Sequence, residues 1–308
     1  MPVDINIKDI QNLLDTAKVT GFTGKCTALG GGEVNDTLIL DCSLQKVILR
    51  ITRYHDVNTL KQEARALSLI DTDQAPKLLY FNEENRIKDR AWILETYISG
   101  KTPDSLTIEQ FESIGELLAK VHEVKSEHQT ILDYWNDFLE ASVHFGDEAF
   151  LLSHPDERLK TLINRARDYF KSRPAMSLRA SLIHGDVTLN NMLANESRIS
   201  LIDWEFSKFK DPMSDFSTMF YEDMEYNKGK WRVHIKDNER EALLGAYKDA
   251  GGHLNYERLK VWLNLDKLGA AVYLYWKLYQ SNHEMKSEQL TQYKLDLSNL
   301  MNSLEKNI

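Results

Sequence analysis

The sequence predicts an α+β protein with a small β-rich lobe followed by a large, mostly helical lobe. Two observations lead to this fold class. Short β-branched segments of alternating polarity occupy most of residues 1–96, a pattern typical of antiparallel strands. After residue 103, apolar side chains recur at helical spacing almost to the end of the chain. The predicted boundaries are a β-rich lobe over 1–96, a joint over 97–103 and a helical lobe over 104–308.

The β-rich lobe opens with an amphipathic helix over 6–17. A three-strand antiparallel meander is then predicted by the segments FTGKCTAL, DTLILDC and QKVILRIT. Helical spacing returns over 57–70, and two further strands are predicted by PKLLYFN and RAWILETYI. We therefore expect a small antiparallel sheet with one main helix.

In the helical lobe, the first helix is expected to begin after Thr107, a suitable N-cap residue. Further helices are predicted over 131–146, 155–172, 213–226, 237–250, 255–281 and 285–305. The exception lies at 182–207, where short β-like stretches carry a cluster of polar side chains. Such polar residues framed by apolar pairs are unusual for a surface turn, so this segment is the first candidate for chemistry.

Composition excludes several classes of protein. The 308-residue chain has a formal net charge of −9, which argues against nucleic-acid binding through bulk electrostatics. Cys26 and Cys42 are expected to be reduced thiols in the core, with proximity on neighbouring strands as the alternative. The first residues lack the pattern of a signal peptide, and no apolar run approaches the roughly 18 residues of a membrane span. We expect a cytoplasmic protein with no membrane partner.

The polar cluster has the composition of a magnesium site. Asp186, Asn191 and Asp203 each stand at the end of a short apolar stretch, in SLIHGDVTLNNML and SLIDWEF. Carboxylate and amide oxygens suit Mg²⁺ rather than zinc, and no cysteine pair or HExxH pattern competes. Because Mg²⁺ usually binds through one or two carboxylates plus substrate phosphates, a nucleoside triphosphate is the natural hypothesis.

The β-rich lobe offers candidate phosphate contacts. LGGGEVNDTLIL, with Gly31, Gly32 and Asn35, is a glycine-rich turn that lets backbone N–H groups approach a phosphate, although hairpins also use glycine without any ligand. Arg50 is a charged residue within the apolar strand KVILRIT, and an edge-strand charge in solvent is the alternative. Glu63 lies in the helix that follows.

The order of these parts along the chain limits the classes of enzyme to which it can belong. The chain has first a glycine-rich hairpin, then a basic residue on the third strand and a glutamate on the next helix, and after a joint HxDxxxxN and a strand that ends in aspartate. Protein-kinase-like phosphotransferases use this same order. HGDVTLNN and LIDWE resemble the signature motifs of the aminoglycoside phosphotransferase and choline kinase family of small-molecule kinases. The resemblance implies a bilobal protein-kinase-like fold.

The resemblance also implies roles for particular residues. Asp186 would be the catalytic base that orients the acceptor hydroxyl, and Asn191 and Asp203 would hold Mg²⁺. Arg50 would contact the α- and β-phosphates of ATP, and Glu63 would pair with Arg50.

The nucleotide would also be held by backbone groups of the β-rich lobe. LETYISG resembles the segment that contacts adenine, with the C=O of Thr96 and the N–H of Ile98 as the expected contacts. The sequence leaves ATP or GTP open and does not specify the oligomeric state.

Two histidines and one aspartate are assigned structural roles. By the resemblance, His184 and Asp215 brace the catalytic loop, whereas His122 is expected to be a buried or capping residue.

Two residues depart from the protein-kinase pattern: Gly185 stands where protein kinases have an arginine, and Arg50 stands where they have a lysine. No APE motif follows, so we expect a small-molecule acceptor rather than a protein.

The acceptor is expected to be cationic. Glu222, in a stretch resembling choline and ethanolamine kinases, and the helix face with Tyr273, Trp276 and Tyr279 would bind it. Aromatic faces attract a quaternary ammonium, although an aromatic stripe can equally be core packing. Choline or a related amino alcohol is favoured. The alternatives are an antibiotic phosphotransferase, for an aminoglycoside or a macrolide, and a nucleotide-binding pseudokinase scaffold.

Overall fold

The computed structural model describes residues 5–29, 35–52, 58–142, 156–173, 176–220, 235–280 and 287–308. The chain divides into two compact units. The first unit contains Met1–Thr102, His184–Asp186 and Asn191–Lys208, and the second contains Pro103–Ile183, Val187–Asn190 and Phe209–Ile308. The polar segment that the sequence prediction assigned to the helical lobe thus makes most of its contacts with the β-rich unit.

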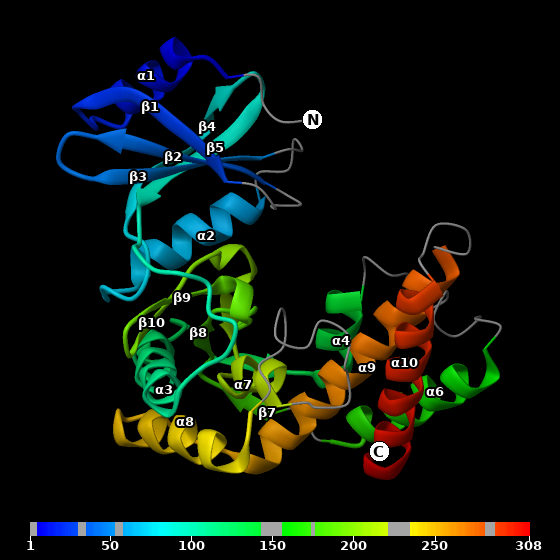
Figure 1. The fold of residues 1–308 in the computed structure, drawn as a ribbon. Coiled ribbons are helices and arrows are strands. Elements are labelled where there is room, and N and C mark those ends of the chain that lie inside the picture. Colours follow the sequence, from blue (N-terminus) through cyan, green and yellow to red (C-terminus); the bar gives the residue numbers. More distant parts are fainter. Residues whose placement is uncertain are drawn as a thin grey trace. The chain divides into compact units, whose positions relative to one another are not determined.

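The first unit is built on an antiparallel five-stranded sheet in the order β1-β2-β3-β5-β4 (Figure 1). Its strands are β1 (Phe22–Leu29), β2 (Asn35–Cys42), β3 (Lys46–Thr52), β4 (Leu78–Ile87) and β5 (Arg90–Thr96). The first three form the predicted meander, and β5 lies between β3 and β4. This arrangement confirms the strand content that alternation predicted.

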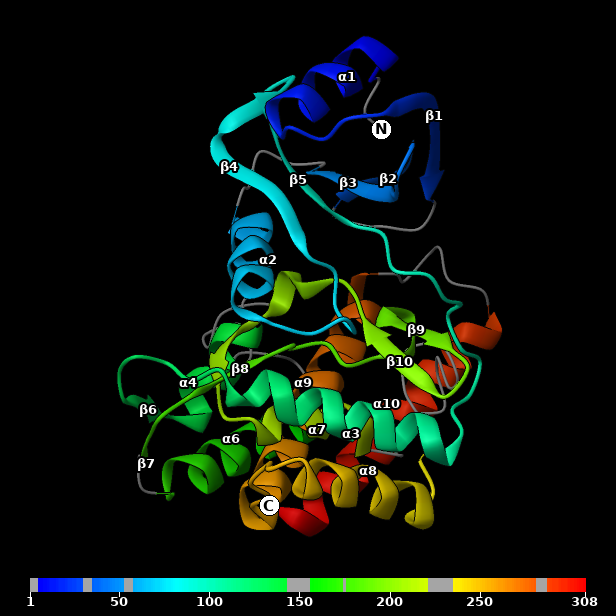
Figure 2. The same cartoon turned by 90° about the vertical axis from the view of Figure 1, so that its left-hand side faces the viewer.

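Helix α1 (Ile7–Thr16) covers one face of this sheet, as Figure 2 shows. A capping box between Asn6 and Asp9 sets its first residue. Its apolar side chains pack against alternate residues of β3 and β5, which are Val47, Leu49, Ile51, Trp92 and Leu94. Because successive strand residues point to opposite faces, the intervening residues Ile48, Arg50, Ile93 and Glu95 point away from α1.

Helix α2 (Asn58–Leu69) matches the helix predicted over 57–70. The polar segment adds a hairpin of β9 (Met192–Asn195) and β10 (Arg198–Leu201), with the single turns η2 (Leu189–Asn191) and η3 (Trp204–Phe206) on either side. Gln74 fastens the hairpin to the unit, because its backbone C=O accepts from the N–H of Leu201 at 2.9 Å and its side chain donates to the C=O of Ile199 at 2.8 Å.

The second unit is mainly helical. Its helices are α3 (Ile108–Glu123), α4 (Tyr134–Ser142), α6 (Glu157–Lys171), α7 (Met213–Phe220), α8 (Asp237–Asp249), α9 (Tyr256–Gln280) and α10 (Ser287–Asn307). Its short strands are β6 (Thr130–Leu132), β7 (Met176–Leu178) and β8 (Ser181–Ile183), together with β11 (Lys208–Lys210) from its second residue onwards. Thr107 forms a capping box with Gln110 at the start of α3, as the sequence predicted.

One predicted helix boundary was wrong. The helix predicted from residue 131 begins at Tyr134, because the side chain of Asp133 accepts the N–H groups of Trp135 and Asn136 and so ends the preceding strand. Residues 130–132 form β6 instead and pair with β7. Apolar spacing alone could not separate these residues from the helix.

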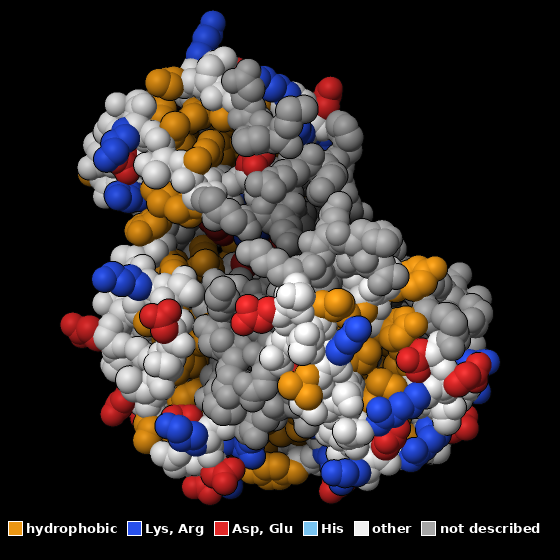
Figure 3. All heavy atoms as spheres, turned by 45° about the vertical axis from the view of Figure 1, so that its right-hand side comes forward, with side chains coloured by type: hydrophobic (Ala, Val, Ile, Leu, Met, Phe, Trp, Pro, Cys, Tyr) orange, Lys and Arg blue, Asp and Glu red, His pale blue; other side chains and the backbone are white. Residues whose placement is uncertain are grey.

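Figure 3 shows acidic, basic and hydrophobic side chains interspersed on the face of the second unit that it presents. Within the residues that the structure describes, none of the helices combines the length and apolar character that crossing a membrane requires.

Candidate functional site

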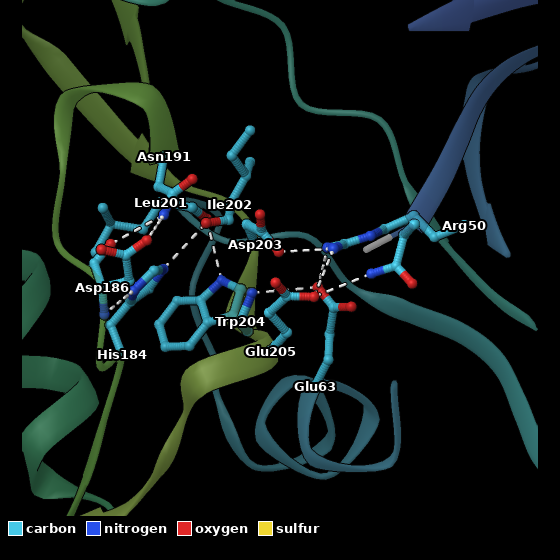
Figure 4. Close-up of polar contacts among 11 residues, drawn as sticks. Arg50, Glu63, His184, Asp186, Asn191, Leu201, Ile202, Asp203, Trp204 and Glu205 are labelled. Atoms are coloured by element: carbon cyan, nitrogen blue, oxygen red, sulfur yellow. Dashed lines mark hydrogen bonds and ion pairs between the residues drawn. The ribbon is translucent and has the colours of Figure 1, made fainter. Parts of the chain in front are cut away.

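The candidate site of the first unit is centred on Arg50 of β3 (Figure 4). Its guanidinium group is buried, with a side-chain exposure of 8%. Nη1 donates to Oε1 of Glu63 at 2.5 Å, and Nη2 donates to Oδ1 of Asp203 at 2.6 Å. Arg50 is therefore not a charge that faces solvent. It joins the sheet to α2 and to the segment that follows the β9–β10 hairpin.

Glu63 is fully buried on α2, and its Oε1 also accepts the backbone N–H of Trp204 at 3.2 Å. Burial raises the pKa of Glu63 above its usual range, while the guanidinium of Arg50 acts in the opposite direction. For Arg50, burial acts to lower the pKa, but the carboxylates of Glu63, Asp203 and Glu95 together raise it. Arg50 therefore remains a cation held by several carboxylates.

Two more acidic residues complete this cluster, which we call the carboxylate cluster: Glu63, Glu95, Asp203 and Glu205. Oε2 of Glu205 lies 3.5 Å from Nη2 of Arg50. Burial raises the pKa of Glu95 and of Glu205 to about 7, and the neighbouring carboxylate of Asp203 acts in the same direction. The raised pKa values show that one guanidinium does not fully offset the four acidic groups, and a further positive charge nearby would favour their ionised forms.

Asp203 occupies the left-handed region of backbone conformation, with φ +66°. This conformation is uncommon outside glycine, although aspartate tolerates it. The adjacent Trp204 is fully buried and donates from its indole N–H to the C=O of Leu201 at 3.1 Å. Anchoring of Trp204 holds Asp203 in place, and the side chain of Asp203 keeps 35% of its surface exposed.

Asp186 and Asn191 are joined directly. The amide nitrogen of Asn191 donates to Oδ2 of Asp186 at 2.7 Å and to its backbone C=O at 3.0 Å. Because the nitrogen makes both bonds, the amide oxygen of Asn191 is the atom that could coordinate a metal. The backbone C=O of Asn191 accepts from the N–H of Ile202 at 2.9 Å, which places Asn191 beside the residue that precedes Asp203.

His184 braces this loop from within the unit. It is fully buried, its Nε2 lies 3.0 Å from the C=O of Ile202, and its Nδ1 accepts the N–H of Asp186 at 3.2 Å. Gly185 has φ +85°, and a β-carbon there would lie 2.4 Å from the carbonyl oxygen of Phe206. Only glycine fits this position, so the departure from the protein-kinase pattern has a steric basis.

Glu205 was not predicted as a site residue. It stands two residues after Asp203 in LIDWE, and an acidic residue at that spacing was the available signal. The amide nitrogen of Asn35 donates to its Oε2 at 3.0 Å. Asn35, predicted as a nucleotide contact, is thus 4% exposed and lies against the carboxylate cluster. Gly31 and Gly32 lie outside the described residues.

Thr96 and Ile98 lie at and just beyond the end of β5. The N–H of Thr96 donates to the C=O of Lys77 at 3.0 Å, and its hydroxyl accepts the N–H of Lys77 at 2.9 Å. These two hydrogen bonds fix Thr96, the residue at which the predicted adenine segment leaves β5, to Lys77 just before β4. Ile98 lies two residues after Thr96 and is half-buried.

The predicted acceptor residues belong to the second unit. On α9, the ring centroids of Tyr273 and Trp276 are 6.4 Å apart, and the ammonium of Lys277 lies 5.5 and 5.2 Å from them. Tyr279 is 57% exposed. The aromatic face thus already holds a cation of its own helix. Glu222 lies outside the described residues.

The buried position expected for His122 is confirmed, because it is 2% exposed. Its Nε2 lies 3.1 Å from Oδ2 of Asp215, and its Nδ1 lies 3.0 Å from the hydroxyl of Tyr247. These contacts tie α3, α7 and α8 together within the second unit.

The sequence model of the phosphotransferase enzyme family matches residues 25–262. The chain belongs to this family. The match spans the sheet, the carboxylate cluster and most of the helical unit, and it confirms the resemblance that HGDVTLNN and LIDWE indicated. A search of curated protein sequences finds no match.

Solved structures of the same fold include enzymes with different acceptors. Aminoglycoside phosphotransferase APH(4)-Ia is 13% identical, with 96% of this chain and 97% of that chain covered and a TM-score of 0.65. Choline kinase LicA from Streptococcus pneumoniae is 15% identical, with 96% and 98% covered and a TM-score of 0.63. Spectinomycin phosphotransferase APH(9)-Ia, solved with ADP and spectinomycin, is 15% identical, with 96% and 98% covered and a TM-score of 0.60. These likenesses confirm the predicted fold class.

Proposed function

We propose that the protein is a cytoplasmic, Mg²⁺-dependent kinase that transfers the γ-phosphoryl group of ATP to a hydroxyl group of a small, cationic metabolite. The observation that carries the proposal is the forked contact of Arg50 with Glu63 and Asp203. This contact holds a buried cation beside the aspartate that the family resemblance assigns to the metal. Choline or a related amino alcohol is the favoured acceptor.

The residues present fit a magnesium ion. Asn191 and Asp203 would hold it through an amide oxygen and a carboxylate oxygen, a hard oxygen set that suits Mg²⁺. The described residues contain no group of three or more His, Cys, Asp or Glu side chains that could bind a metal unaided. Two protein ligands together with phosphate oxygens are what magnesium sites in phosphotransferases commonly use, and the bound ion neutralises phosphate charge.

Asp186 would act on the acceptor hydroxyl. The hydrogen bond from Asn191 fixes one carboxylate oxygen, and the other would accept the hydroxyl proton while the hydroxyl oxygen bonds to the γ-phosphorus. The bond from that phosphorus to the bridging oxygen breaks, and ADP leaves. Positioning and charge neutralisation supply most of the rate enhancement in such reactions.

The nucleotide would be held at two places in the first unit. One terminal nitrogen of Arg50 would turn towards the α- and β-phosphates, since a guanidinium can bind two oxygens. Gly31 and Gly32 would supply backbone N–H groups, and Thr96 and Ile98 would contact the adenine base. The presence of ADP in the spectinomycin phosphotransferase structure supports an adenine nucleotide.

The cationic acceptor is supported by α9 and by Glu222. Lys277 over Tyr273 and Trp276 is an ammonium group already seated on these rings, which indicates that their faces suit a cation. The alternative acceptor is an antibiotic, as in two of the structural relatives. A pseudokinase scaffold is disfavoured because Arg50 and Asp186 both retain the partners that phosphotransfer requires.

The test is ADP release with MgATP against a panel of choline, ethanolamine, thiamine, several aminoglycosides, a macrolide and a few sugars. A saturable response to choline or another amino alcohol would support the proposal in full. A response to an antibiotic alone would keep the catalytic roles and replace the acceptor. Binding of MgATP without ADP release, even after long incubation, would favour the scaffold.

A further inference from the structure

Arg50 and Glu95 are diagonal neighbours on one face of the sheet. In the register of β3 and β5, Arg50 lies opposite Ile93 and Ile48 lies opposite Glu95. Directly opposed residues share a face, and so do residues two apart on a strand, so all four side chains point away from α1. Diagonal neighbours are within reach of each other when their side chains are long.

Each of these two side chains keeps one polar atom without a partner. Glu95 is 5% exposed, and its Oε2 is buried and accepts no hydrogen bond from the described residues. Nε of Arg50 is likewise buried and donates to none of them. An acceptor and a donor on neighbouring side chains are therefore both unsatisfied. Burial raises the pKa of Glu95, and Arg50 is the group that favours its ionised form.

The existing contacts of Arg50 explain why a third carboxylate is useful. Its two terminal nitrogens span Glu63 and Asp203. In the proposed reaction, Asp203 would hold the metal through a carboxylate oxygen, and Nη2 of Arg50 would turn towards phosphate, which weakens the contact between Nη2 and Asp203. The short hydrogen bond to Glu63 then holds the guanidinium, with Glu205 farther away at 3.5 Å, and a long flexible side chain held mainly at one point is poorly positioned.

We propose that Glu95 is a positioning residue that accepts the Nε–H of Arg50 and thereby orients the guanidinium towards the nucleotide phosphates. The inference rests on the proposed function, because it concerns the state with nucleotide bound. A lysine side chain has no nitrogen at the position of Nε. Glu95 can therefore accept this hydrogen bond from an arginine at position 50 but could not accept it from a lysine there.

A double-mutant cycle tests this pairing. Kd for MgATP is measured by calorimetry for the wild-type protein, Glu95→Leu, Arg50→Lys and the double variant. We expect Glu95→Leu to raise Kd about tenfold in the wild-type background and less than about twofold in the Arg50→Lys background, the non-additivity of a direct pair. Glu95→Gln keeps an acceptor oxygen and should restore most of the affinity that Glu95→Leu loses.

Glu84→Leu is the matched control, since Glu84 is an exposed glutamate on β4 of the same sheet and should leave Kd unchanged. Equal losses from Glu95→Leu in both backgrounds would overturn the inference, because a purely structural role does not depend on the residue at position 50. So would a Glu95→Gln variant as weak as Glu95→Leu. Failure of the wild-type protein to bind MgATP would instead overturn the proposed function, and this inference with it.

Discussion

The carboxylate cluster of the first unit and the aromatic face of α9 in the second unit are constructed differently. In the cluster, Arg50 contacts Glu63 of α2 and two carboxylates from the segment after β10, which lie far from it in the sequence. On α9, Tyr273, Trp276 and Lys277 meet through the spacing of one helix. The first arrangement is mostly buried and joins segments far apart in the sequence, whereas the second lies on the partly exposed face of a single helix.

Under the proposed function, this difference separates the residues that would carry the reaction from those that would set acceptor specificity. Arg50, which is proposed to act on phosphate, is held by buried contacts with Glu63 and Asp203, which suits a chemistry common to a family. Groups proposed to bind the acceptor lie on a half-exposed helix face, which suits a property that differs among relatives with similar folds. Changes in the cluster should therefore affect rate and stability, and changes on α9 should affect acceptor affinity alone.

The largest effect is expected from Asp186→Asn. The variant removes the proposed proton acceptor but keeps the size of the side chain, so kcat should fall by about 10³-fold or more. Kd for MgATP should change by less than about threefold, because Asp186 makes no proposed contact with the nucleotide. Steady-state kinetics with the best acceptor of the panel, together with calorimetry, check both values. A kcat within tenfold of wild type would exclude Asp186 as the base.

Arg50→Met should have the next largest effect, on stability. It leaves Glu63 and Asp203 buried or half-buried without their cation, and breaking a buried ion pair in this way typically costs about 3–5 kcal/mol. Urea unfolding measures the free energy of unfolding. Arg50→Met combined with Glu63→Leu should recover part of the loss, because the buried carboxylate is then also removed. A loss below about 1 kcal/mol for the single variant would mean that the cluster contributes little to the fold.

The sequence predicted much of the candidate site and could not predict the rest. Motif order placed Arg50, Glu63, Asp186, Asn191 and Asp203 in one site, and the structure joins them in two groups of direct contacts. Strand alternation could not decide whether Arg50 faced solvent, because that depends on which face α1 covers.

Glu95 and Glu205 were missed for a related reason. Neither glutamate stands out in the sequence. Glu95 lies near the end of a predicted strand, and Glu205 lies in LIDWE, a motif whose predicted role was assigned to Asp203. Their importance comes from the residues that register and chain folding place beside them: Arg50 on the adjacent strand for Glu95, and Asn35 of β2 for Glu205. Such pairings depend on tertiary contacts between segments far apart in the chain.

A third prediction concerns pH. Burial raises the pKa of Glu95 to about 7, above the value of 4.5 for an unburied glutamate. The folded protein therefore binds this proton more tightly than the unfolded chain, and the contribution of Glu95 to stability falls as pH rises from 4.5 through 7. Glu95→Gln removes this titration. Near pH 8 it should increase the free energy of unfolding by on the order of 1–3 kcal/mol, and near pH 5 by much less.

Thermal or urea unfolding of the wild-type protein and Glu95→Gln at the two pH values measures this difference. Glu84→Gln, at an exposed position of the same sheet, is the control and should show the same stability as wild type at both. A difference between wild type and Glu95→Gln that does not change with pH would mean that Glu95 titrates like an exposed glutamate.

The smallest effect is expected on α9, and it separates the two regions most clearly. Trp276→Leu removes one aromatic face, and loss of one cation–π contact of about 0.5–2 kcal/mol should raise KM for a cationic acceptor by roughly 2- to 30-fold. Both kcat and Kd for MgATP should remain near wild type. Lys277→Met is the informative partner variant, because it removes the ammonium that now lies over Tyr273 and Trp276. If that ammonium competes with the acceptor, Lys277→Met should lower KM; if the aromatic face is only packing, neither variant should change KM, and the acceptor must be bound elsewhere.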